Sequence, residues 1–256
     1  MKYSMKCPVI RKDPLARGIY DYLIYAPQIA EAAVCGQFVN IKAEGFFLRR
    51  PISICGIDRE KGTIRLVFEV RGDGTKVISS INEGDNMDIV GPLGGKGFEL
   101  SDKSKRAVII GGGIGTPPLL PIAEHYGRNA VVITGFRSAD AVILQKDYIK
   151  SGADVILCTD DGTAGRKGFV TQALSEVLEK ETPDMVYACG PMPMLRGVAK
   201  MCLDKGIRTQ VSLEERMGCG LGGCLVCVCR TQKNDEEVYS HVCKDGPVFE
   251  AEEVLF

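Results

Sequence analysis

The stretch Ala107-Val-Ile-Ile-Gly-Gly-Gly-Ile-Gly-Thr-Pro-Pro118 joins a run of apolar residues to a glycine-rich turn and then to two prolines. A strand that ends in glycines just before a helix presents backbone N–H groups and a helix N-terminus to a phosphate. Pro118 suits the first turn of that helix, where its missing N–H costs nothing. Many strand–helix corners carry glycine, so this turn alone does not establish a phosphate-binding site. The neighbouring sequence has to support that interpretation.

Strand and helix patterns alternate along the chain after this turn. We predict strands at residues 107–110, 130–134, 154–158, 185–188 and 209–213. We predict helices at residues 118–126, 141–150, 169–179 and 192–205. Such alternation is typical of a doubly wound parallel sheet with helices on both faces.

A second turn, Cys189-Gly190-Pro191-Met192, follows a later strand and repeats the arrangement. Ligands of open parallel sheets bind beyond the carboxyl ends of the strands, so we expect both turns to hold a nucleotide. The residues expected to do so are Gly111, Gly113, Gly115, Thr116, Cys189, Gly190 and Pro191. The choice between NAD and NADP stays open. No acidic residue ends strand 130–134, and Arg137 would either meet a 2′-phosphate or remain a solvated surface arginine.

Cysteines crowd the C-terminal region in the spacing Cys219-x4-Cys224-x2-Cys227, with Cys243 further on. The first three match the plant-type spacing for a [2Fe–2S] cluster, which takes a more distant fourth ligand. Four glycines in this region let the backbone approach a cluster closely: Gly218, Gly220, Gly222 and Gly223. A hairpin that turns at residues 233–235 would bring Cys243 back to the others.

The alternative for these cysteines is a four-cysteine zinc site, although zinc sites more often use two CxxC-like pairs. Cys229 lies two residues after Cys227, so in an extended segment it faces the same side, and we interpret it as a neighbour of the cluster. A Rieske-type site needs two histidine ligands. We interpret His125 and His241 as non-ligands, because His125 ends a predicted helix far upstream. The six scattered cysteines are interpreted as small buried hydrophobes.

The first hundred residues show short strand patterns separated by turn signals. Strands are predicted at residues 20–25, 37–41, 64–70 and 86–90, with turns at Asp73-Gly74, Glu83-Gly84 and Gly94-Gly95. Many short strands with glycine-rich turns favour a small antiparallel barrel. The predicted fold class is therefore α/β plus β: an N-terminal barrel, a central parallel sheet and a small C-terminal cluster domain.

Composition and charge exclude some classes of partner. The chain has 256 residues, of which 45% are hydrophobic, and its 32 basic and 33 acidic residues nearly balance. This gives no electrostatic reason to expect nucleic acid or an anionic membrane as a partner. The N-terminus lacks the apolar segment of a secretory signal, and the apolar stretch 107–123 is short for a membrane span. A cytoplasmic protein is the expectation.

The segment Arg50-Pro51-Ile52-Ser53, followed downstream by Gly74-Thr75, resembles the flavin site of the ferredoxin reductase superfamily. The resemblance implies that Arg50 meets the FAD pyrophosphate and that Ser53 hydrogen-bonds the flavin ring near N5. It also places Val67, Phe68 and Glu69 beside the cofactor. An arginine fork suits a pyrophosphate, but Arg50 alone would also fit a surface cation beside a buried strand.

Nearly the whole chain is similar to the family of electron-transfer subunits of NAD-dependent dihydroorotate dehydrogenase B. The segments that carry the resemblance are RRPIS, GDGT, GGGIGTPPL, CGPMPML, ERMGCGLGGCLVCV and VCKDGPVF. The resemblance implies an FAD barrel domain at 1–101, an NAD domain at 102–213 and a [2Fe–2S] domain at 214–256. The implied cluster ligands are Cys219, Cys224, Cys227 and Cys243.

The implied chemistry follows from the three redox groups. A nicotinamide exchanges a hydride, a [2Fe–2S] cluster takes single electrons, and a flavin does both, so FAD must stand between them. In the resembled family, an FMN-binding catalytic subunit oxidises dihydroorotate to orotate in pyrimidine biosynthesis, as a heterotetramer of two plus two chains. No residue of this chain needs to transfer a proton. Rival interpretations are a reductase subunit that serves ferredoxin, a hydrogenase or a sulfide-type reductase, and a zinc-binding module without enzymatic activity.

Overall fold

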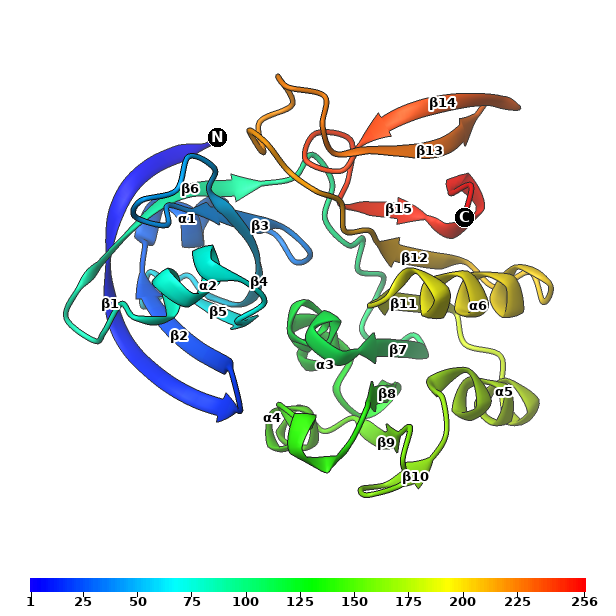
Figure 1. The fold of residues 1–256 in the computed structure, drawn as a ribbon. Coiled ribbons are helices and arrows are strands. Elements are labelled where there is room, and N and C mark those ends of the chain that lie inside the picture. The colour runs from blue at the N-terminus through cyan, green and yellow to red at the C-terminus, as the bar shows by residue number, and fades with distance from the viewer. The chain divides into compact units, whose positions relative to one another are not determined.

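The computed structural model describes all of residues 1–256, which form two compact units (Figure 1). The first comprises Met1–Gly97, Glu214–Cys229 and Tyr239–Pro247, and the second comprises Phe98–Leu213, Arg230–Val238 and Val248–Phe256. Residues 214–256 therefore contribute to both units, and the domain bounds 1–101, 102–213 and 214–256 stay a prediction. None of the helices has the length and apolar composition that a membrane span requires.

The predicted barrel is confirmed. Its strands close in the order β1-β2-β5-β4-β3-β6. Their bounds are β1 (Tyr3–Ala16), β2 (Ile19–Tyr25), β3 (Phe38–Ile41), β4 (Arg50–Asp58), β5 (Thr63–Glu69) and β6 (Asn86–Leu93). Two short helices accompany the barrel, α1 (Pro27–Ala32) and α2 (Asp73–Ser79).

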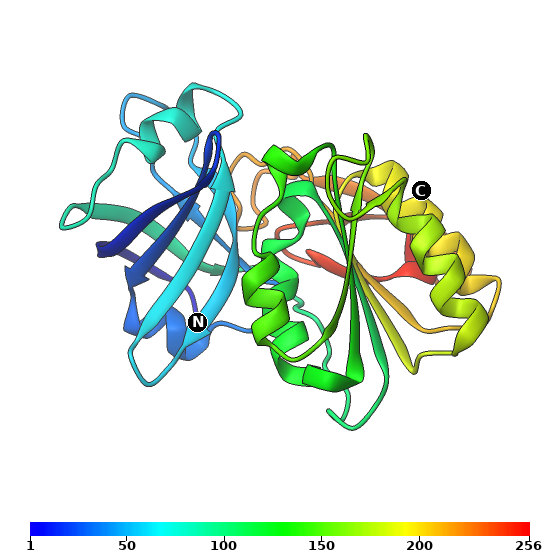
Figure 2. The ribbon, with the colours of Figure 1, turned by 90° about the horizontal axis from the view of Figure 1, so that it is seen from below.

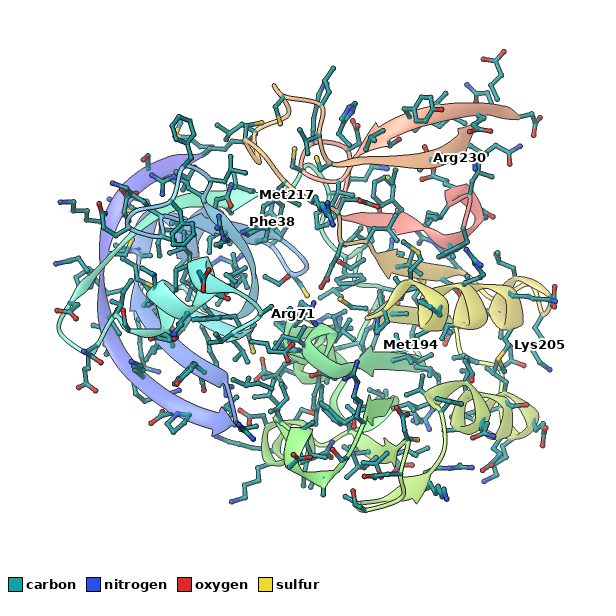
Figure 3. All side chains as sticks on the ribbon, in the orientation of Figure 1. Phe38, Arg71, Met194, Lys205, Met217 and Arg230 are labelled. Atoms are coloured by element: carbon teal, nitrogen blue, oxygen red, sulfur yellow. The ribbon has the colours of Figure 1, made fainter.

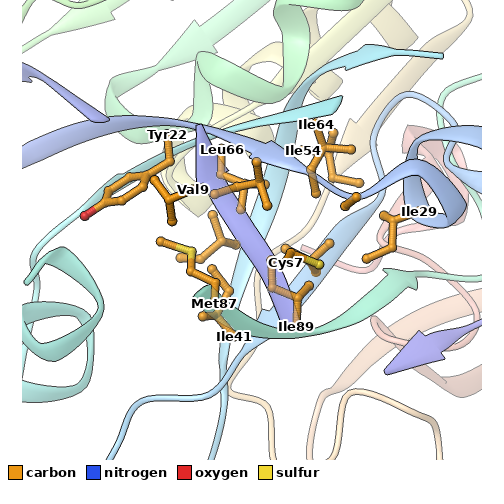
Figure 4. Close-up of a cluster of buried hydrophobic side chains, with 14 of the residues drawn as sticks. Cys7, Val9, Tyr22, Ile29, Ile41, Ile54, Ile64, Leu66, Met87 and Ile89 are labelled. Carbon is orange, nitrogen blue, oxygen red and sulfur yellow. The ribbon is translucent and has the colours of Figure 1, made fainter. Parts of the chain in front are cut away.

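Apolar side chains from every strand fill the barrel (Figure 4). Val39 and Ile41 of β3 belong to this core, as do Ile52 and Ile54 of β4. Alternate residues of each strand project from the outer face of the barrel. Cross-strand partners share a face, and β3 pairs with β4 through Phe38–Ser53 and Asn40–Pro51. The outer face of the barrel therefore carries these four side chains together.

Two features of the barrel differ from the prediction. The predicted turn at Asp73-Gly74 is wrong, because these residues begin helix α2. Thr75 caps the first turn of α2, where its hydroxyl accepts a hydrogen bond from the N–H of Gly72 at 3.2 Å. The strands β1 and β4 were not among those predicted, and in the long β1 Pro8 and Pro14 interrupt the pattern. β1 accommodates Pro14 beside an irregularity in its pairing with β2. The turn at Glu83-Gly84 is confirmed, and Gly84 has a φ of +86°.

The predicted parallel sheet is also confirmed. Its strands stand in the order β10-β9-β8-β7-β11-β12-β15. Their bounds are β7 (Ala107–Gly112), β8 (Ala130–Phe136), β9 (Asp154–Thr159), β10 (Arg166–Lys167), β11 (Met185–Cys189), β12 (Thr209–Ser212) and β15 (Val248–Glu250). β15 is the exception to the parallel arrangement, since it pairs with β12 antiparallel, and the irregular C-terminal pattern did not reveal it.

Four helices cover the two faces of this sheet, α3 and α4 on one face and α5 and α6 on the other (Figure 2). Their bounds are α3 (Leu120–Tyr126), α4 (Gln145–Lys150), α5 (Val170–Lys180) and α6 (Met192–Leu203). The prediction of helix from residue 141 was wrong, because Leu144 takes a φ of +60° and α4 starts after it. Short 3-10 turns at Gly113–Gly115 and Pro117–Leu119 precede α3, which therefore begins later than predicted.

The predicted C-terminal hairpin is confirmed as β13 (Val228–Lys233) and β14 (Glu236–His241). Asn234 and Asp235 make its turn with φ values of +51° and +63°, as a two-residue hairpin of the primed type requires. Cys243 lies two residues after the end of β14. Further 3-10 turns lie at Gly127–Asn129, Ala139–Ala141 and Ala251–Glu253.

Candidate functional site

The two halves of the predicted flavin motif meet in the barrel unit. Arg50 is the first residue of β4, and its Nη1 donates to the carbonyl of Leu48 at 2.5 Å. Its guanidinium lies 5.1 Å from the ring centroid of Phe46. A β-carbon added to Gly74 would lie 2.6 Å from Cζ of Arg50, so the arginine fork rests against the first turn of α2.

The hydroxyl of Thr75 is used within the first turn of α2 and is not free to bind a ligand. The hydroxyl donates to the carbonyl of Gly72 at 2.9 Å and accepts from the N–H of Arg71 at 3.0 Å. These bonds fix the direction of the N–H groups in the first turn. A guanidinium beside the N-terminal N–H groups of a helix is an arrangement suited to phosphate oxygens.

The remaining flavin candidates divide between the two faces of the barrel wall. Pro51 and Ser53 lie on the outer face, whereas Ile52 and Phe68 lie in the core, where Phe68 stacks on Tyr22 with ring centroids 5.6 Å apart. Val67 is also buried. Ile52 and Phe68 therefore have only backbone groups to offer a ligand. Glu69 stays partly exposed and pairs with Arg71 at 2.8 Å.

The four predicted cluster ligands come together as two pairs within the irregular segment that starts near Met217 (Figure 3) and the turn after β14. The N–H of Cys219 donates to Sγ of Cys224 at 3.3 Å, and the N–H of Cys243 donates to Sγ of Cys227 at 3.4 Å. Nowhere in the chain do three Cys, His, Asp or Glu side chains gather around a single ion position. Two thiol pairs match the two ligand positions that each iron of a [2Fe–2S] rhomb takes from four cysteines.

Backbone N–H groups point at the sulfur of Cys219. Leu221 and Gly223 donate to it at 3.3 and 3.4 Å, and the Leu221 bond is the main reason that the pKa of this thiol falls to about 6. Gly220 and Gly222 have φ values of +69° and +87°, which glycine adopts freely. Burial, followed by the contact with Cys227, raises the pKa of Cys243 to about 12. The N–H groups of the loop thus stabilise negative charge on the sulfur of Cys219, whereas burial disfavours the charged form of Cys243.

Cys229 and the two histidines have other partners. Sγ of Cys229 donates to the carbonyl of Ser240 on β14 at 3.5 Å, and burial raises its pKa to about 11. His241 pairs with Asp245 at 3.6 Å, and a ring nitrogen of His125 lies 2.9 Å from the carbonyl of Ser101. These contacts support the interpretation that none of the three is a ligand.

The two glycine turns of the second unit lie side by side because β7 and β11 are neighbours. A β-carbon on Gly115 would lie 2.6 Å from the carbonyl oxygen of Cys189, and one on Gly190 would lie 3.0 Å from the nitrogen of Gly112. From β7 the chain runs outward through β8, β9 and β10, and then crosses to β11 on the other side of β7. The turns therefore lie at the topological switch point, where such sheets bind nucleotides.

Thr116 shapes the first turn from within. It is buried, its hydroxyl donates to the carbonyl of Gly113 at 2.8 Å, and its own carbonyl accepts from the hydroxyl of Tyr148 at 2.6 Å. Gly113 has a φ of +53°. Thr116 thus stabilises the shape of the turn, and its hydroxyl is already hydrogen-bonded within that turn.

An acidic residue does reach the end of β8, although the sequence of that strand carries none. The N–H of Asp161, which follows β9, donates to the carbonyl of Arg137 at 3.3 Å. Its carboxylate accepts from the hydroxyl of Thr163 at 2.7 Å. Sequence reasoning missed Asp161 because only the pairing of β8 with β9 brings it there.

Asn40 was also missed. This residue of β3 is 1% exposed, and its Nδ2 donates to the carbonyl of Cys219 at 3.4 Å. The signal in the sequence is a lone amide inside the apolar run Phe38–Ile41. Hydrophobic periodicity alone does not predict which group such an amide would hydrogen-bond.

Comparison with protein families and known proteins bears on this geometry. Residues 214–255 match the family described as the iron–sulfur cluster binding domain of dihydroorotate dehydrogenase B. The electron transfer subunit of dihydroorotate dehydrogenase B (NAD(+)) from Geobacillus sp. (strain WCH70) is 40% identical over 255 residues, 96% of each chain. The subunit of the same name from Bacillus cereus (strain B4264) is 38% identical over the same shares.

Solved structures agree on the fold. The NADH-dependent reduced ferredoxin–NADP oxidoreductase, studied for flavin-based electron bifurcation, superposes with a TM-score of 0.86 at 29% identity, covering 99% of this chain and 91% of that one. The ferredoxin reductase of carbazole 1,9a-dioxygenase superposes with a TM-score of 0.67 at 20% identity, covering 80% and 67%. The second likeness supports the fold alone. Identity of 40% over nearly the full length of both chains decides the family: this chain belongs to the electron transfer subunits of dihydroorotate dehydrogenase B (NAD(+)).

Proposed function

We propose that this chain carries one FAD and one [2Fe–2S] cluster and moves electrons between NAD(H) and an FMN-binding dihydroorotate dehydrogenase subunit. The observation that carries the proposal is the pair of thiol pairs, Cys219 with Cys224 and Cys227 with Cys243, inside a region that matches the iron–sulfur family. In the cell, electrons would run from dihydroorotate through the partner and this chain to NAD+, as a step of pyrimidine biosynthesis.

For the flavin, Arg50 and the first turn of α2 would hold the pyrophosphate. Arg50 supplies a planar cation, and Thr75 holds the N–H groups of that turn in place. Pro51 and Ser53 would face the ring system from the outer wall of the barrel. When bound, FAD converts a two-electron hydride transfer into single-electron steps.

For the cluster, Cys219 and Cys224 would bind one iron, and Cys227 and Cys243 the other. The N–H groups of Leu221 and Gly223 stabilise negative charge on the Cys219 sulfur. The glycines at positive φ let the loop pass close to the metal centre without side chains in the way.

For the nucleotide, the turns at Gly111–Thr116 and Cys189–Pro191 would bind NAD at the switch point of the sheet. Their close backbone contact gives two sets of N–H groups near one phosphate position. Asp161 beside Arg137 would favour a ribose hydroxyl over a 2′-phosphate, because a carboxylate repels the second anion.

The partner would dock on the cluster loop. Cys224 is exposed there, and so are the side chains of Leu221, Leu225 and Val226. An exposed apolar patch beside a redox centre fits a protein surface that must come close for electron transfer. We propose a heterotetramer of two plus two chains in the cytoplasm.

The second candidate function is a reductase subunit that serves ferredoxin. The likeness to the NADH-dependent reduced ferredoxin–NADP oxidoreductase favours it, at 29% identity over nearly the full length. Both functions need the same cofactors and differ in the electron acceptor. They are separated by offering the purified chain a [2Fe–2S] ferredoxin or the FMN-binding subunit with dihydroorotate.

The test is purification of the chain followed by flavin and metal analysis, EPR of the reduced protein and a dihydroorotate:NAD+ assay. We expect one FAD and two irons per chain, and activity with dihydroorotate only after the FMN-binding subunit is added. Zinc in place of iron would refute the cluster assignment, and a colourless protein would refute both cofactors. Reduction of ferredoxin without coupling to the FMN-binding subunit would establish the second candidate.

A further inference from the structure

Asn40 is a buried polar residue in β3, whose other residues are all apolar and buried. It is 1% exposed and stands between Val39 and Ile41, which both belong to the barrel core. Its side chain therefore projects from the outer face of the wall, where its strand partner is Pro51 of the flavin motif. On that face it is covered by the cluster loop.

The contact with the loop is made at the first cluster ligand. Nδ2 of Asn40 donates to the carbonyl of Cys219 at 3.4 Å. A β-carbon on Gly220 would lie 3.4 Å from Cγ of Asn40 and still closer to Nδ2, so the loop backbone rests directly on the amide. Gly220 allows this approach and also has a positive φ of +69°.

The other end of the amide has no partner. Oδ1 of Asn40 is the one buried side-chain N or O atom of the chain without a hydrogen bond. Turning the amide over would set Oδ1 against the carbonyl of Cys219, so the contact with the loop fixes its orientation. An unpaired buried acceptor costs free energy, and an apolar side chain of the same volume would avoid that cost. Asn40 is therefore not explained by the stability of the barrel.

We propose that Asn40 is a positioning residue that holds Cys219, and with it the [2Fe–2S] cluster, against the barrel wall beside the flavin motif. The inference rests on the proposed function, because it requires the cluster to be bound at Cys219. The N–H of the amide points toward the loop and contributes positive potential there. Since the cluster gains negative charge on reduction, this dipole favours the reduced form and raises the midpoint potential.

The test uses three variants of the full chain with its cofactors bound. Asn40→Leu removes the amide at similar volume, Asn40→Asp keeps the shape but places a negative charge toward Cys219, and Val39→Ala damages the other face of the same strand. We expect the midpoint potential of the cluster, measured by EPR-monitored titration, to fall from wild type to Asn40→Leu and further to Asn40→Asp. Val39→Ala should leave it unchanged.

The unfolding temperature should separate Asn40→Leu from Val39→Ala. Asn40→Leu should keep or raise the unfolding temperature, because it removes the unpaired oxygen, whereas Val39→Ala should lower it by opening a core cavity. Hydrogen exchange at the N–H groups of Leu221 and Gly223 should quicken in Asn40→Leu by about five-fold, the equivalent of one ordinary hydrogen bond.

The outcomes separate the two levels of inference. A wild-type chain without a [2Fe–2S] signal would refute the proposed function itself. A wild-type chain with the signal, and an Asn40→Leu variant with unchanged potential and unchanged exchange, would refute only the positioning role. A loss of unfolding temperature in Asn40→Leu equal to that of Val39→Ala would assign the amide to packing.

Discussion

The guanidinium of Arg50 lies so close to the α-carbon of Gly74 that a β-carbon there would come within 2.6 Å of Cζ. The two residues belong to β4 and α2, and they carry the two halves of the flavin motif. Glycine at this position is thus required by the arginine and not by the backbone, because Gly74 has no positive φ. The relationship gives a way to disturb the anion site without touching the arginine itself.

Gly74→Ala should weaken FAD binding while the barrel stays folded. The new methyl group would displace the end of the flexible Arg50 side chain, whereas alanine in a helix stabilises it by up to about 1 kcal/mol relative to glycine. The measurement is FAD affinity by fluorescence titration of the apoprotein, with the unfolding temperature recorded beside it. Gly72→Ala is the matched control, since a β-carbon there meets nothing within 4 Å. Equal FAD affinity in both variants would contradict the pyrophosphate site.

Arg50→Ala should lower FAD affinity by about ten- to one hundred-fold. A hydrogen bond to a charged group is typically worth about 1.5–3 kcal/mol, and Arg50 would make such bonds to the pyrophosphate. Arg49→Ala is the control, because Arg49 pairs with Asp88 at 2.8 Å and serves the barrel. It should cost stability and leave FAD affinity near wild type. If the two variants retain FAD equally, Arg50 is a surface cation and not a cofactor ligand.

Serine in place of any of the four paired cysteines should remove or damage the cluster. The four variants are Cys219→Ser, Cys224→Ser, Cys227→Ser and Cys243→Ser. Cys229→Ser should keep it, because that thiol donates to Ser240 and lies outside the two pairs. Iron content and the EPR signal of the reduced protein measure the outcome. Loss of the cluster in Cys229→Ser alone would overturn the ligand assignment.

Gly115→Ala should weaken NADH binding and destabilise the second unit. Its β-carbon would stand 2.6 Å from the carbonyl oxygen of Cys189, and backbone cannot move aside as a side chain can. Gly197→Ala in α6 is the control, since the nearest atom is a methyl group of Thr171 at 3.2 Å. Titration with NADH, followed by stopped-flow reduction of the flavin, measures the effect. Wild-type NADH affinity in Gly115→Ala would show that NADH binding does not require close contact between the Gly111–Thr116 and Cys189–Pro191 turns.

Much of the fold could be predicted because its signals are local. The alternation after Ala107 determines the parallel sheet, and the turn at Asn234 and Asp235 determines the hairpin that returns Cys243. The cysteine spacing likewise pointed to the pairs that the structure brings together. Each of these features depends on residues that are near one another in the chain.

The features that sequence reasoning missed depend on an ambiguous local signal or on contacts between distant parts of the chain. Asp-Gly at residues 73 and 74 suits a turn and a helix start equally, and only the capping bonds of Thr75 decide between them. Asp161 reaches Arg137 through the pairing of β8 with β9, and Asn40 reaches Cys219 from a strand far earlier in the chain. Hydrophobic periodicity does not predict contacts between residues so far apart in the chain.

Leu225 provides the test of the partner surface. It is 62% exposed, stands directly after Cys224, and has a φ of +60°. A non-glycine residue in this conformation costs roughly 1–2 kcal/mol, and asparagine tolerates it better than leucine does. An exposed leucine held at that cost, beside a cluster ligand, is expected to serve a contact outside the chain.

Leu225→Asn should therefore keep the fold and the cluster but weaken coupling to the FMN-binding subunit. In a titration of that subunit at fixed chain concentration, the dihydroorotate:NAD+ activity should reach half its maximum at a higher partner concentration than in wild type. NADH oxidation with an artificial dye serves as the reference for the chain itself. Ile149→Lys, which changes an exposed apolar residue on α4, should follow the wild-type curve. A Leu225→Asn curve that coincides with wild type would place the docking surface elsewhere, and dihydroorotate:NAD+ activity in the single chain would refute the two-subunit function.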